Sequence, residues 1–203
     1  MANKLISTKS GRLIKKILSV EEIIKGCKNN DNSCKEMMYK SFYGYLMGII
    51  LRYVNNSYDG EELVNDCFIK IFKNIESFQP PKETTELSKT FKGWIAKIAS
   101  RTAIDKLRTL KNQSYVDDLS EDEHPVSQVS IASDLHVQDI LKLLNDLPDT
   151  HRLVFNLYEI EGFAHDEISK MMNIPESSSR VYLTRAKNKL RALYLKTLVS
   201  SYE

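Results

Sequence analysis

Residues 164–190 read AHDEISKMMNIPESSSRVYLTRAKNKL, and this stretch has the layout of a helix-turn-helix. A short helix over 164–172 is followed by a tight turn over 173–175 and by a longer helix over about 176–198. Four residues of the longer helix recur at helical spacing and form one inward stripe, namely Ser179, Leu183, Ala186 and Leu190. The stretch therefore predicts a small helical domain at the C-terminal end.

The other faces of the longer helix carry small polar and basic side chains, namely Ser177, Ser178, Arg180, Tyr182, Arg185 and Lys187. Small polar residues at a helix start can approach a groove closely, arginines can pair with guanine edges, and lysines can neutralise phosphates. This pattern favours duplex DNA binding. The alternative is a solvated basic face on an ordinary helical hairpin, because helix-turn-helix spacing also occurs in bundles that bind nothing.

A second helix, predicted over about 90–111, mixes an apolar stripe with basic side chains. Phe91 and Trp94 lie on the stripe, and the basic residues between and after them include Lys92, Lys97 and Arg101. A single nucleic-acid strand needs both features, since its bases stack on rings while cations neutralise its phosphates. The alternative is that both rings belong to the core. The segment before this helix, over 77–89, predicts a long loop, and long loops in small domains are often functional.

A third helix, predicted from about residue 57, begins with a cluster of carboxylates: Asp59, Glu61, Glu62 and Asp66. Negative charge is favourable at a helix N-terminus, but four carboxylates exceed that need. The cluster therefore indicates a basic protein partner. Upstream of it, Ser19 with Glu22 and Ser33 with Glu36 fit the capping-box pattern and predict two more helix starts.

Composition and charge also favour a helical protein with a nucleic-acid partner. The 203 residues include 42% apolar residues but only 7 glycines and 5 prolines, which favours an all-α protein over a turn-rich β fold. The net charge of +2 conceals a strong asymmetry: residues 1–115 carry +8, residues 116–146 carry −7 and residues 147–203 carry +1. A basic segment of this kind indicates a polyanionic partner, with nucleic acid the first class to consider.

Several other function classes find no support in the sequence. Cys27, Cys34 and Cys67 lack metal-ligand spacing, so we expect free, buried, reduced thiols and no metal or cofactor. His165, Asp166 and Glu167 superficially resemble an acid–base cluster, but neighbouring helical residues point in different directions, and we expect a surface role for them. No catalytic motif is present, so we expect no catalytic residues. No apolar run reaches the roughly 20 residues of a membrane span, and we expect a cytoplasmic protein.

Taken together, three segments resemble bacterial RNA polymerase sigma factors of the sigma-70 family, specifically the extracytoplasmic-function (ECF) subfamily. Residues 59–68 read DGEELVNDCF and are similar to that family's acidic D-x-E-D-L segment. Residues 91–108 read FKGWIAKIASRTAIDKLR and are similar to its F-x-x-W-L-x-x-I-A segment. The tail, from Leu147 through the helix-turn-helix to Lys187, resembles its C-terminal promoter-binding domain.

The resemblance implies two small helical domains joined by a flexible acidic linker. Its expected boundaries are a basic N-terminal extension over 1–18, sigma region 2 over 19–112, a linker over 113–135 and sigma region 4 over 136–203. The implied partners are core RNA polymerase and promoter DNA, both as duplex and as melted non-template strand. An anti-sigma factor is a further candidate partner, and direct membrane insertion is not expected.

The family pattern also assigns roles to individual positions. Asp59, Glu61, Glu62 and Asp66 would bind the polymerase. Lys92, Trp94, Lys97 and Arg101 would hold the minus-ten element, next to a loop that captures a flipped base. Ser177, Ser178, Arg180, Tyr182, Arg185 and Lys187 would read the minus-35 element.

The sequence departs from the family pattern at three places: Ser100–Arg101 replaces a frequent Arg-Asn pair, Ser179 replaces a frequent valine, and Tyr182 replaces a frequent arginine. These departures predict base contacts that differ from those of other members.

The sequence thus predicts a transcription initiation factor that directs core polymerase to specific promoters and assists their opening. A stand-alone helix-turn-helix regulator is the alternative, although it leaves the acidic helix and the Trp94 segment unexplained. A nucleic-acid enzyme is a weaker alternative, because acid–base and metal-ligand sets are missing.

Overall fold

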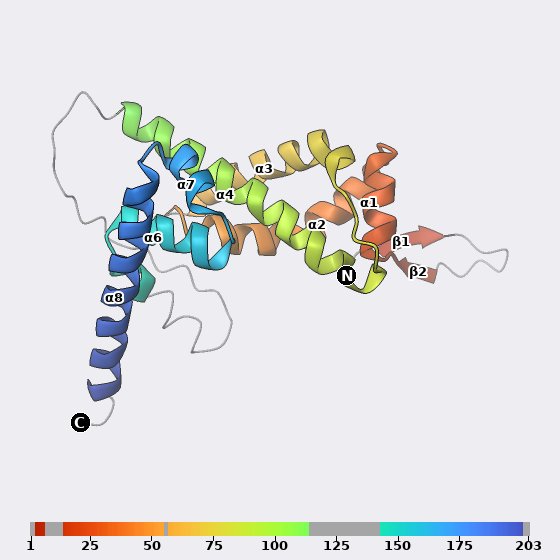
Figure 1. Cartoon of the computed structure of the whole chain (residues 1–203). Helices are drawn as coiled ribbons and strands as arrows, with labels where there is room; N and C mark the ends of the chain where they lie inside the picture. The colour runs from red at the N-terminus through yellow and green to blue at the C-terminus, as the bar shows by residue number, and fades with distance from the viewer. Residues whose placement is uncertain (1–2, 7–13, 55–56, 114–142, 201–203) are drawn as a thin grey trace. The chain divides into compact units, whose positions relative to one another are not determined.

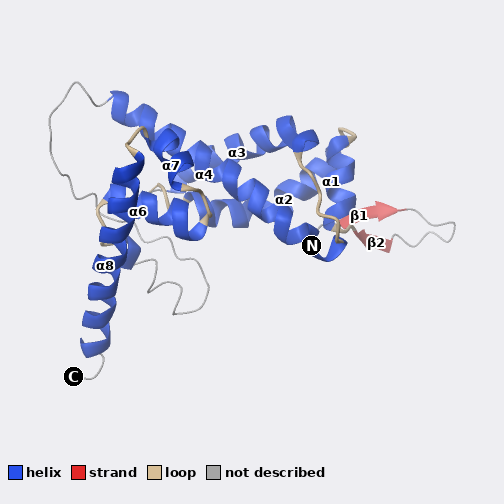
Figure 2. Cartoon of the chain, in the orientation of Figure 1, coloured by secondary structure: helices blue, strands red, loops and turns tan. Residues whose placement is uncertain are grey.

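The computed structural model of the chain describes residues 3–6, 14–54, 57–113 and 143–200, and these are predominantly helical (Figures 1 and 2). The all-α fold class is confirmed, with one small addition. The strands β1 (Asn3–Ile6) and β2 (Ile14–Ile17) form an antiparallel hairpin in which Asn3 pairs with Ile17. The hairpin lies inside the expected N-terminal extension, and its four-residue strands are too short for periodicity to indicate them. The expected linker over 113–135 lies almost wholly outside the described residues.

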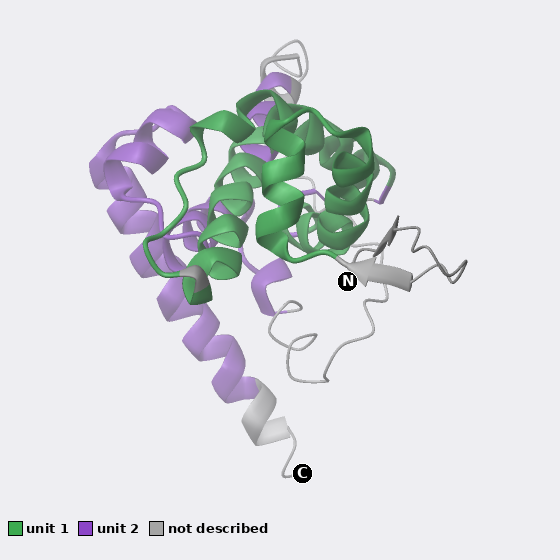
Figure 3. Cartoon of the chain, turned by 90° about the vertical axis from the view of Figure 1, so that its right-hand side faces the viewer, with its two compact units in different colours: residues 1–51, 58–102 green, residues 52–57, 103–203 purple. Residues whose placement is uncertain are grey.

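The chain divides into two compact units, coloured separately in Figure 3. Unit 1 comprises 1–51 and 58–102, and it contains α1 (Val20–Lys28), α2 (Asn32–Ile50), α3 (Ser57–Asn74, from residue 58) and the first part of α4 (Leu87–Gln113). Two short 3-10 turns, η1 (Ile75–Ser77) and η2 (Thr84–Glu86), lie between α3 and α4. The predicted loop over 77–89 is therefore shorter than expected, because α4 begins at Leu87.

One of the two predicted helix caps in unit 1 is correct. Ser19 caps α1 in a full capping box with Glu22. The prediction for Ser33 was wrong, because Asp31 caps α2 by accepting hydrogen bonds from the backbone N–H groups of Ser33 (2.8 Å) and Cys34 (3.3 Å). A carboxylate at this position also interacts favourably with the helix dipole.

An aromatic cluster lies at the centre of unit 1. Phe91 of α4 is fully buried, and its ring centroid lies 5.2 Å from that of Phe42 on α2 and 5.1 Å from that of Phe78 after η1. Trp94 packs against both Phe78 and Phe91. Offset and edge-on contacts of this kind add to the stability that burial of the rings provides. The cluster fixes α4 against α2, so it determines which face of α4 is exposed.

Unit 2 comprises 52–57 and 103–203 and contains the helix-turn-helix. Its described helices after residue 148 are α6 (Asp149–Phe155), the π-helical turn η4 (Asn156–Ile160), α7 (His165–Met172) and α8 (Glu176–Ser200). Asn173 ends α7 in the left-handed conformation (φ 53°), which asparagine tolerates better than most residues. Leu144, Leu147 and Ala186 form the centre of a small core against which Phe155 and Leu190 pack. None of the described helices is both long and apolar enough to cross a membrane.

Candidate protein and nucleic-acid interfaces

The outward side of α3 combines carboxylates with exposed apolar residues. Successive helical residues turn by about 100°, which places Tyr58, Glu62, Asp66 and Ile69 on one stripe, opposite the buried Val64 and Ile71. Ile69 is 64% exposed and Tyr58 is 81% exposed. We call these four residues the α3 stripe. Exposed carboxylates between exposed apolar side chains favour a protein-binding surface over a solvated face.

The four carboxylates predicted from sequence do not all share this surface. Asp59 lies at the edge of the α3 stripe, whereas Glu61 points to the opposite flank, towards α2. There, burial and then the Glu61 carboxylate raise the pKa of Tyr43. Asn65 on the same flank accepts a hydrogen bond from the Tyr39 hydroxyl (2.9 Å).

Sequence reasoning did not identify Tyr58 and Ile69. Their spacing of four and three residues from Glu62 and Asp66 is the signal that could have revealed them.

The four residues predicted to hold the minus-ten element lie on two different sides of α4. Trp94, Lys97 and Arg101 follow one another at spacings of three and four residues and share a face. Lys92 points the other way, and its ammonium lies 5.5 Å from the centroid of the Tyr45 ring. Trp94 is half-buried, so one part of its ring packs in the aromatic cluster while the rest stays accessible. Phe91 is fully buried and belongs to the core.

The inward stripe predicted for the recognition helix α8 is confirmed. Ser179, Leu183 and Ala186 are buried, and Leu190 is half-buried against the small core of unit 2. Of the residues that the sequence analysis assigned to DNA, Ser177, Arg180, Arg185 and Lys187 are exposed, whereas Ser178 and Tyr182 are half-buried. Their neighbours, however, divide them into two groups.

The first group lies on the flank of α8 where carboxylates are available. Arg180 forms an ion pair with Glu176 one turn earlier, and the Lys187 ammonium lies 2.6 Å from the Glu159 carboxylate of η4. These carboxylates neutralise two cations that the sequence analysis assigned to DNA. Lys187 is the more strongly affected, because Glu159 belongs to a different element and is only 34% exposed.

The second group lies on the opposite flank and combines cations with rings. The Tyr182 ring packs at 5.3 Å from the ring of His151 on α6. Burial, then Arg185 and Lys189, lower the pKa of His151. Arg185 and Lys189 thus place two positive charges near this ring, and Ser178 lies on the same flank by helical spacing. We call Ser178, Tyr182, Arg185, Lys189 and His151 the basic flank of unit 2; sequence reasoning did not single out His151, because it lies on another helix.

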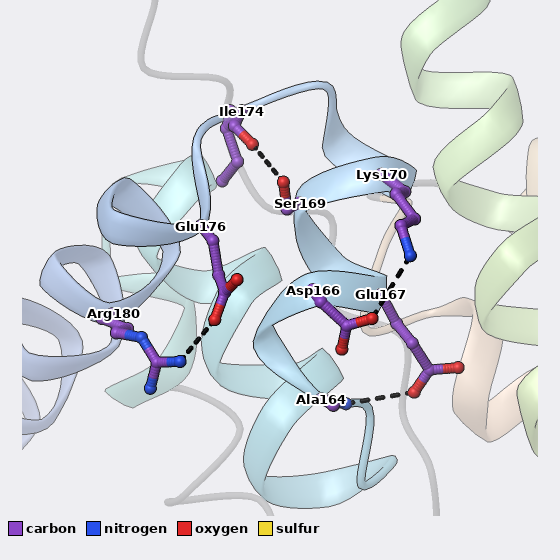
Figure 4. A network of polar contacts seen from close by, with 8 residues as sticks. All are labelled: Ala164, Asp166, Glu167, Ser169, Lys170, Ile174, Glu176 and Arg180. Carbon is purple, nitrogen blue, oxygen red and sulfur yellow. Dashed lines mark hydrogen bonds and ion pairs between the residues drawn. The ribbon is translucent and has the colours of Figure 1, made fainter.

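A network of polar contacts braces the helix-turn-helix (Figure 4). The Ser169 hydroxyl donates to the carbonyl of Ile174 (2.7 Å) across the turn, and the Ala164 N–H donates to the Glu167 carboxylate (3.1 Å) at the start of α7. Lys170 pairs with Asp166 at 3.3 Å. The Ser169 side chain therefore holds the short turn between α7 and α8 together with the backbone, while the other two contacts stabilise α7.

The residues 165–167 behave differently from the sequence-based expectation of a surface role. Asp166 is exposed, but the expectation was wrong for His165, which is only 9% exposed. The His165 ring points inward, because it stacks on the ring of Tyr158 and forms a hydrogen bond with Ser179. Among the described residues, no group of three His, Cys, Asp or Glu side chains could hold a metal ion.

All three cysteines are free and buried, as the sequence predicts. Burial, with a contribution from Cys34, raises the pKa of Cys27 to about 12, and burial raises the pKa of Cys67 to about 11. Both thiols are therefore protonated at neutral pH and poorly nucleophilic.

Comparisons with known proteins match both units. Residues 38–113 match the family described as "Sigma-70 region 2", and residues 137–190 match "Sigma-70, region 4". The chain is similar to the ECF RNA polymerase sigma factors SigM and SigW of Bacillus subtilis. SigM is 25% identical over 77% of this chain and 93% of its own length, and SigW is 24% identical over 86% and 96%. Among solved structures, the sigma factor RpoE of Bartonella quintana, in complex with the anti-sigma factor NepR, is similar with a TM-score of 0.51 and 19% identity; the match covers 78% of this chain and 95% of that one.

Proposed function

The chain belongs to the sigma-70 family, in its ECF subfamily, and we propose on this premise that it is a transcription initiation factor. It binds core RNA polymerase, directs the polymerase to specific promoters and assists the opening of the duplex. The observation that carries the proposal is the presence of both sigma regions, in order, on one chain. A stand-alone helix-turn-helix regulator would account for region 4 but would leave region 2 without a role.

We assign polymerase binding to the α3 stripe, with Asp59 at its edge. The exposed Ile69 and Tyr58 provide apolar area, while Glu62 and Asp66 provide charge for a basic partner surface. An interface gains most of its affinity from a few apolar or aromatic anchors, and charges around them set specificity and association rate. Glu62 and Asp66, which the sequence predicted as polymerase-binding residues, retain that role in this assignment. Glu61 would contribute less to polymerase binding.

We assign the melted minus-ten strand to the face of α4 that carries Trp94, Lys97 and Arg101. A half-buried ring offers a surface for a base to stack on, and its packed side keeps it rigid. Cations one and two turns further along the helix would neutralise successive phosphates. Lys92, on the other side of the helix, would contribute less to the same strand.

We assign the duplex minus-35 element to the start of α8 and to the basic flank of unit 2. Ser177 and Ser178 allow close approach to the groove, and Tyr182 and Arg185 provide base and phosphate contacts. Arg180 is next to them in sequence and remains exposed, although it pairs with Glu176.

These assignments require no catalysis by the chain itself, because the polymerase performs the chemistry. Acting on chromosomal promoters places the protein in the cytoplasm. An anti-sigma factor is a candidate regulatory partner, since the Bartonella quintana relative is held in a complex with one.

Reconstitution with a bacterial core polymerase tests the proposal directly. The full chain is expected to co-purify with core polymerase and to permit initiation on a subset of promoters in a genomic DNA pool, detected by sequencing the transcripts. Core polymerase alone serves as the control. A chain that binds DNA fragments but neither binds core polymerase nor supports initiation would establish the stand-alone regulator instead.

The two groups of cations on α8 lead to a prediction about duplex binding. Replacing Arg185 with alanine is expected to weaken binding to a minus-35 duplex by about 1–3 kcal/mol, because an exposed arginine of the basic flank would lose a base or phosphate contact. Replacing Lys187 with alanine is expected to cost less than about 0.5 kcal/mol, since Glu159 already neutralises that ammonium. Fluorescence anisotropy with labelled duplex at two salt concentrations measures both. Equal losses for the two variants would contradict the division of α8 into two functional flanks.

A further inference from the structure

A buried polar contact joins the two helices of the helix-turn-helix at their inner faces. The Nδ1 atom of His165, at the start of α7, lies 2.9 Å from the hydroxyl oxygen of Ser179 on α8. Ser179 is fully buried and His165 is 9% exposed. On its other side the His165 ring stacks on the ring of Tyr158 in η4, with centroids 4.4 Å apart and planes inclined by 22°. Three elements of unit 2 therefore meet at this one imidazole.

Unit 2 also buries apolar side chains, among them Phe163, Ile168 and Leu183. Apolar contacts depend weakly on direction, so a helix held only by them can rotate slightly at little cost. A hydrogen bond depends on distance and angle, and a buried polar group that loses its partner carries a desolvation cost. The His165–Ser179 contact is therefore the feature of this interface that is most sensitive to the rotation of α8.

The position of Ser179 connects that rotation to DNA. Its neighbour Ser178 lies on the basic flank, and Tyr182 and Arg185 follow one and two turns later on the same flank. A rotation of α8 by about 20° moves a side-chain tip that lies about 6 Å from the helix axis by about 2 Å. Hydrogen bonds to base edges tolerate only tenths of an ångström, so such a rotation changes which bases these residues can contact.

We infer that His165 and Ser179 form a positioning pair that sets the rotation of α8 and, through it, the bases that the recognition helix prefers. Neither residue touches DNA in this arrangement, since both face the interior of the unit. The inference rests on the proposed function, because it concerns the minus-35 contact assigned to α8.

The charges around His165 favour its neutral form. Burial, then Arg180, lower the pKa of His165; Glu176 opposes this effect and Lys187 adds to it, and all three charged residues belong to α8. The η4 side presents the uncharged Tyr158 ring. The Nδ1 atom of a neutral imidazole can accept a hydrogen bond from the Ser179 hydroxyl or donate one to its oxygen, so either tautomer satisfies the pair.

Four variants of the full chain test the inference. Ser179→Ala removes the hydroxyl, His165→Phe keeps a ring for Tyr158 but removes the nitrogen, and the double variant leaves an interface with neither polar atom. Ser179→Thr is the conservative control, since it retains a hydroxyl. Each is assembled with core polymerase and used to select from a pool of promoters randomised in the minus-35 element, while unfolding is followed by circular dichroism.

Wild type and Ser179→Thr are expected to enrich the same sequences. The double variant is expected to recover thermal stability relative to the single variants and yet to change the relative enrichment of preferred sequences by about tenfold, because rotation of α8 changes a base contact. If the double variant enriches the wild-type sequences, the pair acts only in packing and the inference fails. If the wild-type assembly enriches no sequence, the proposed function fails instead.

The pH dependence of stability provides a second readout. Because folding lowers the pKa of His165 below its unfolded value, the unfolded state binds more protons as the pH falls below about 6.5. The melting temperature of the wild type should therefore fall more than that of His165→Phe between pH 7 and pH 5. The same decrease in both proteins would show that His165 is not buried in its neutral form in the folded unit and would overturn its part in the pair.

Discussion

Reversing two charges on the α3 stripe, with Glu62→Lys and Asp66→Lys together, is expected to weaken binding to core polymerase by at least about 100-fold, because like charges placed face to face cost several kcal/mol. Both side chains lie between the exposed Tyr58 and Ile69 on the outward side of α3. Replacing Ile69 with alanine removes apolar area without changing charge and is expected to cost about tenfold. Titration of labelled chain with core polymerase, monitored by anisotropy, measures both effects.

Glu61 provides a matched control on the same helix. Glu61→Lys makes the same charge change one residue before Glu62, but on the flank that faces Tyr43. It should therefore weaken binding much less than Glu62→Lys alone. Circular dichroism establishes whether each variant is folded, and binding of minus-35 duplex, which is assigned to unit 2, should be unchanged in all of them. Equal effects of Glu61→Lys and Glu62→Lys would refute the α3 stripe as the docking surface.

The features that the sequence predicted correctly depend on residues close together in the chain. The inward stripe of α8 follows from helical spacing alone, and Ser179, Leu183 and Ala186 are indeed buried. The Ser19 capping box follows from two residues three positions apart. The Ser33 cap failed for a local reason as well, since Asp31 competes for the same backbone N–H groups and begins the helix earlier.

The features that the sequence did not predict depend on contacts between elements. Lys187 looks like any other cation of α8 until Glu159 of η4 is placed beside it. His165 and Ser179 lie 14 residues apart, and their contact requires the left-handed turn at Asn173 as well as the π-helical turn that positions Tyr158. Spacing rules assign a residue to a face of its own helix. They do not indicate which neighbouring element will neutralise or bury it.

Phe91→Ala is expected to lower the free energy of unfolding of unit 1 by about 3–5 kcal/mol, the usual cost of removing a buried phenylalanine side chain. Phe91 is fully buried and contacts Phe42, Phe78 and Trp94, so its loss leaves a cavity between α2 and α4. Trp94 is the single tryptophan of the chain, and its fluorescence in a urea titration reports on unit 1 specifically.

Phe72→Ala is the comparison for this substitution, because Phe72 is half-buried on α3 and packs on Phe68 and under Lys35. Phe72→Ala should cost about 1–2 kcal/mol, in proportion to the smaller apolar area that Phe72 buries.

Since domains are typically stable by only 5–15 kcal/mol, Phe91→Ala should remove a large part of the stability of unit 1 and reduce polymerase binding and minus-ten recognition together. The variants of the α3 stripe, in contrast, should reduce polymerase binding but not minus-ten recognition. A Phe91→Ala protein that unfolds at the wild-type urea concentration would contradict the assignment of this ring to the stabilising core of unit 1.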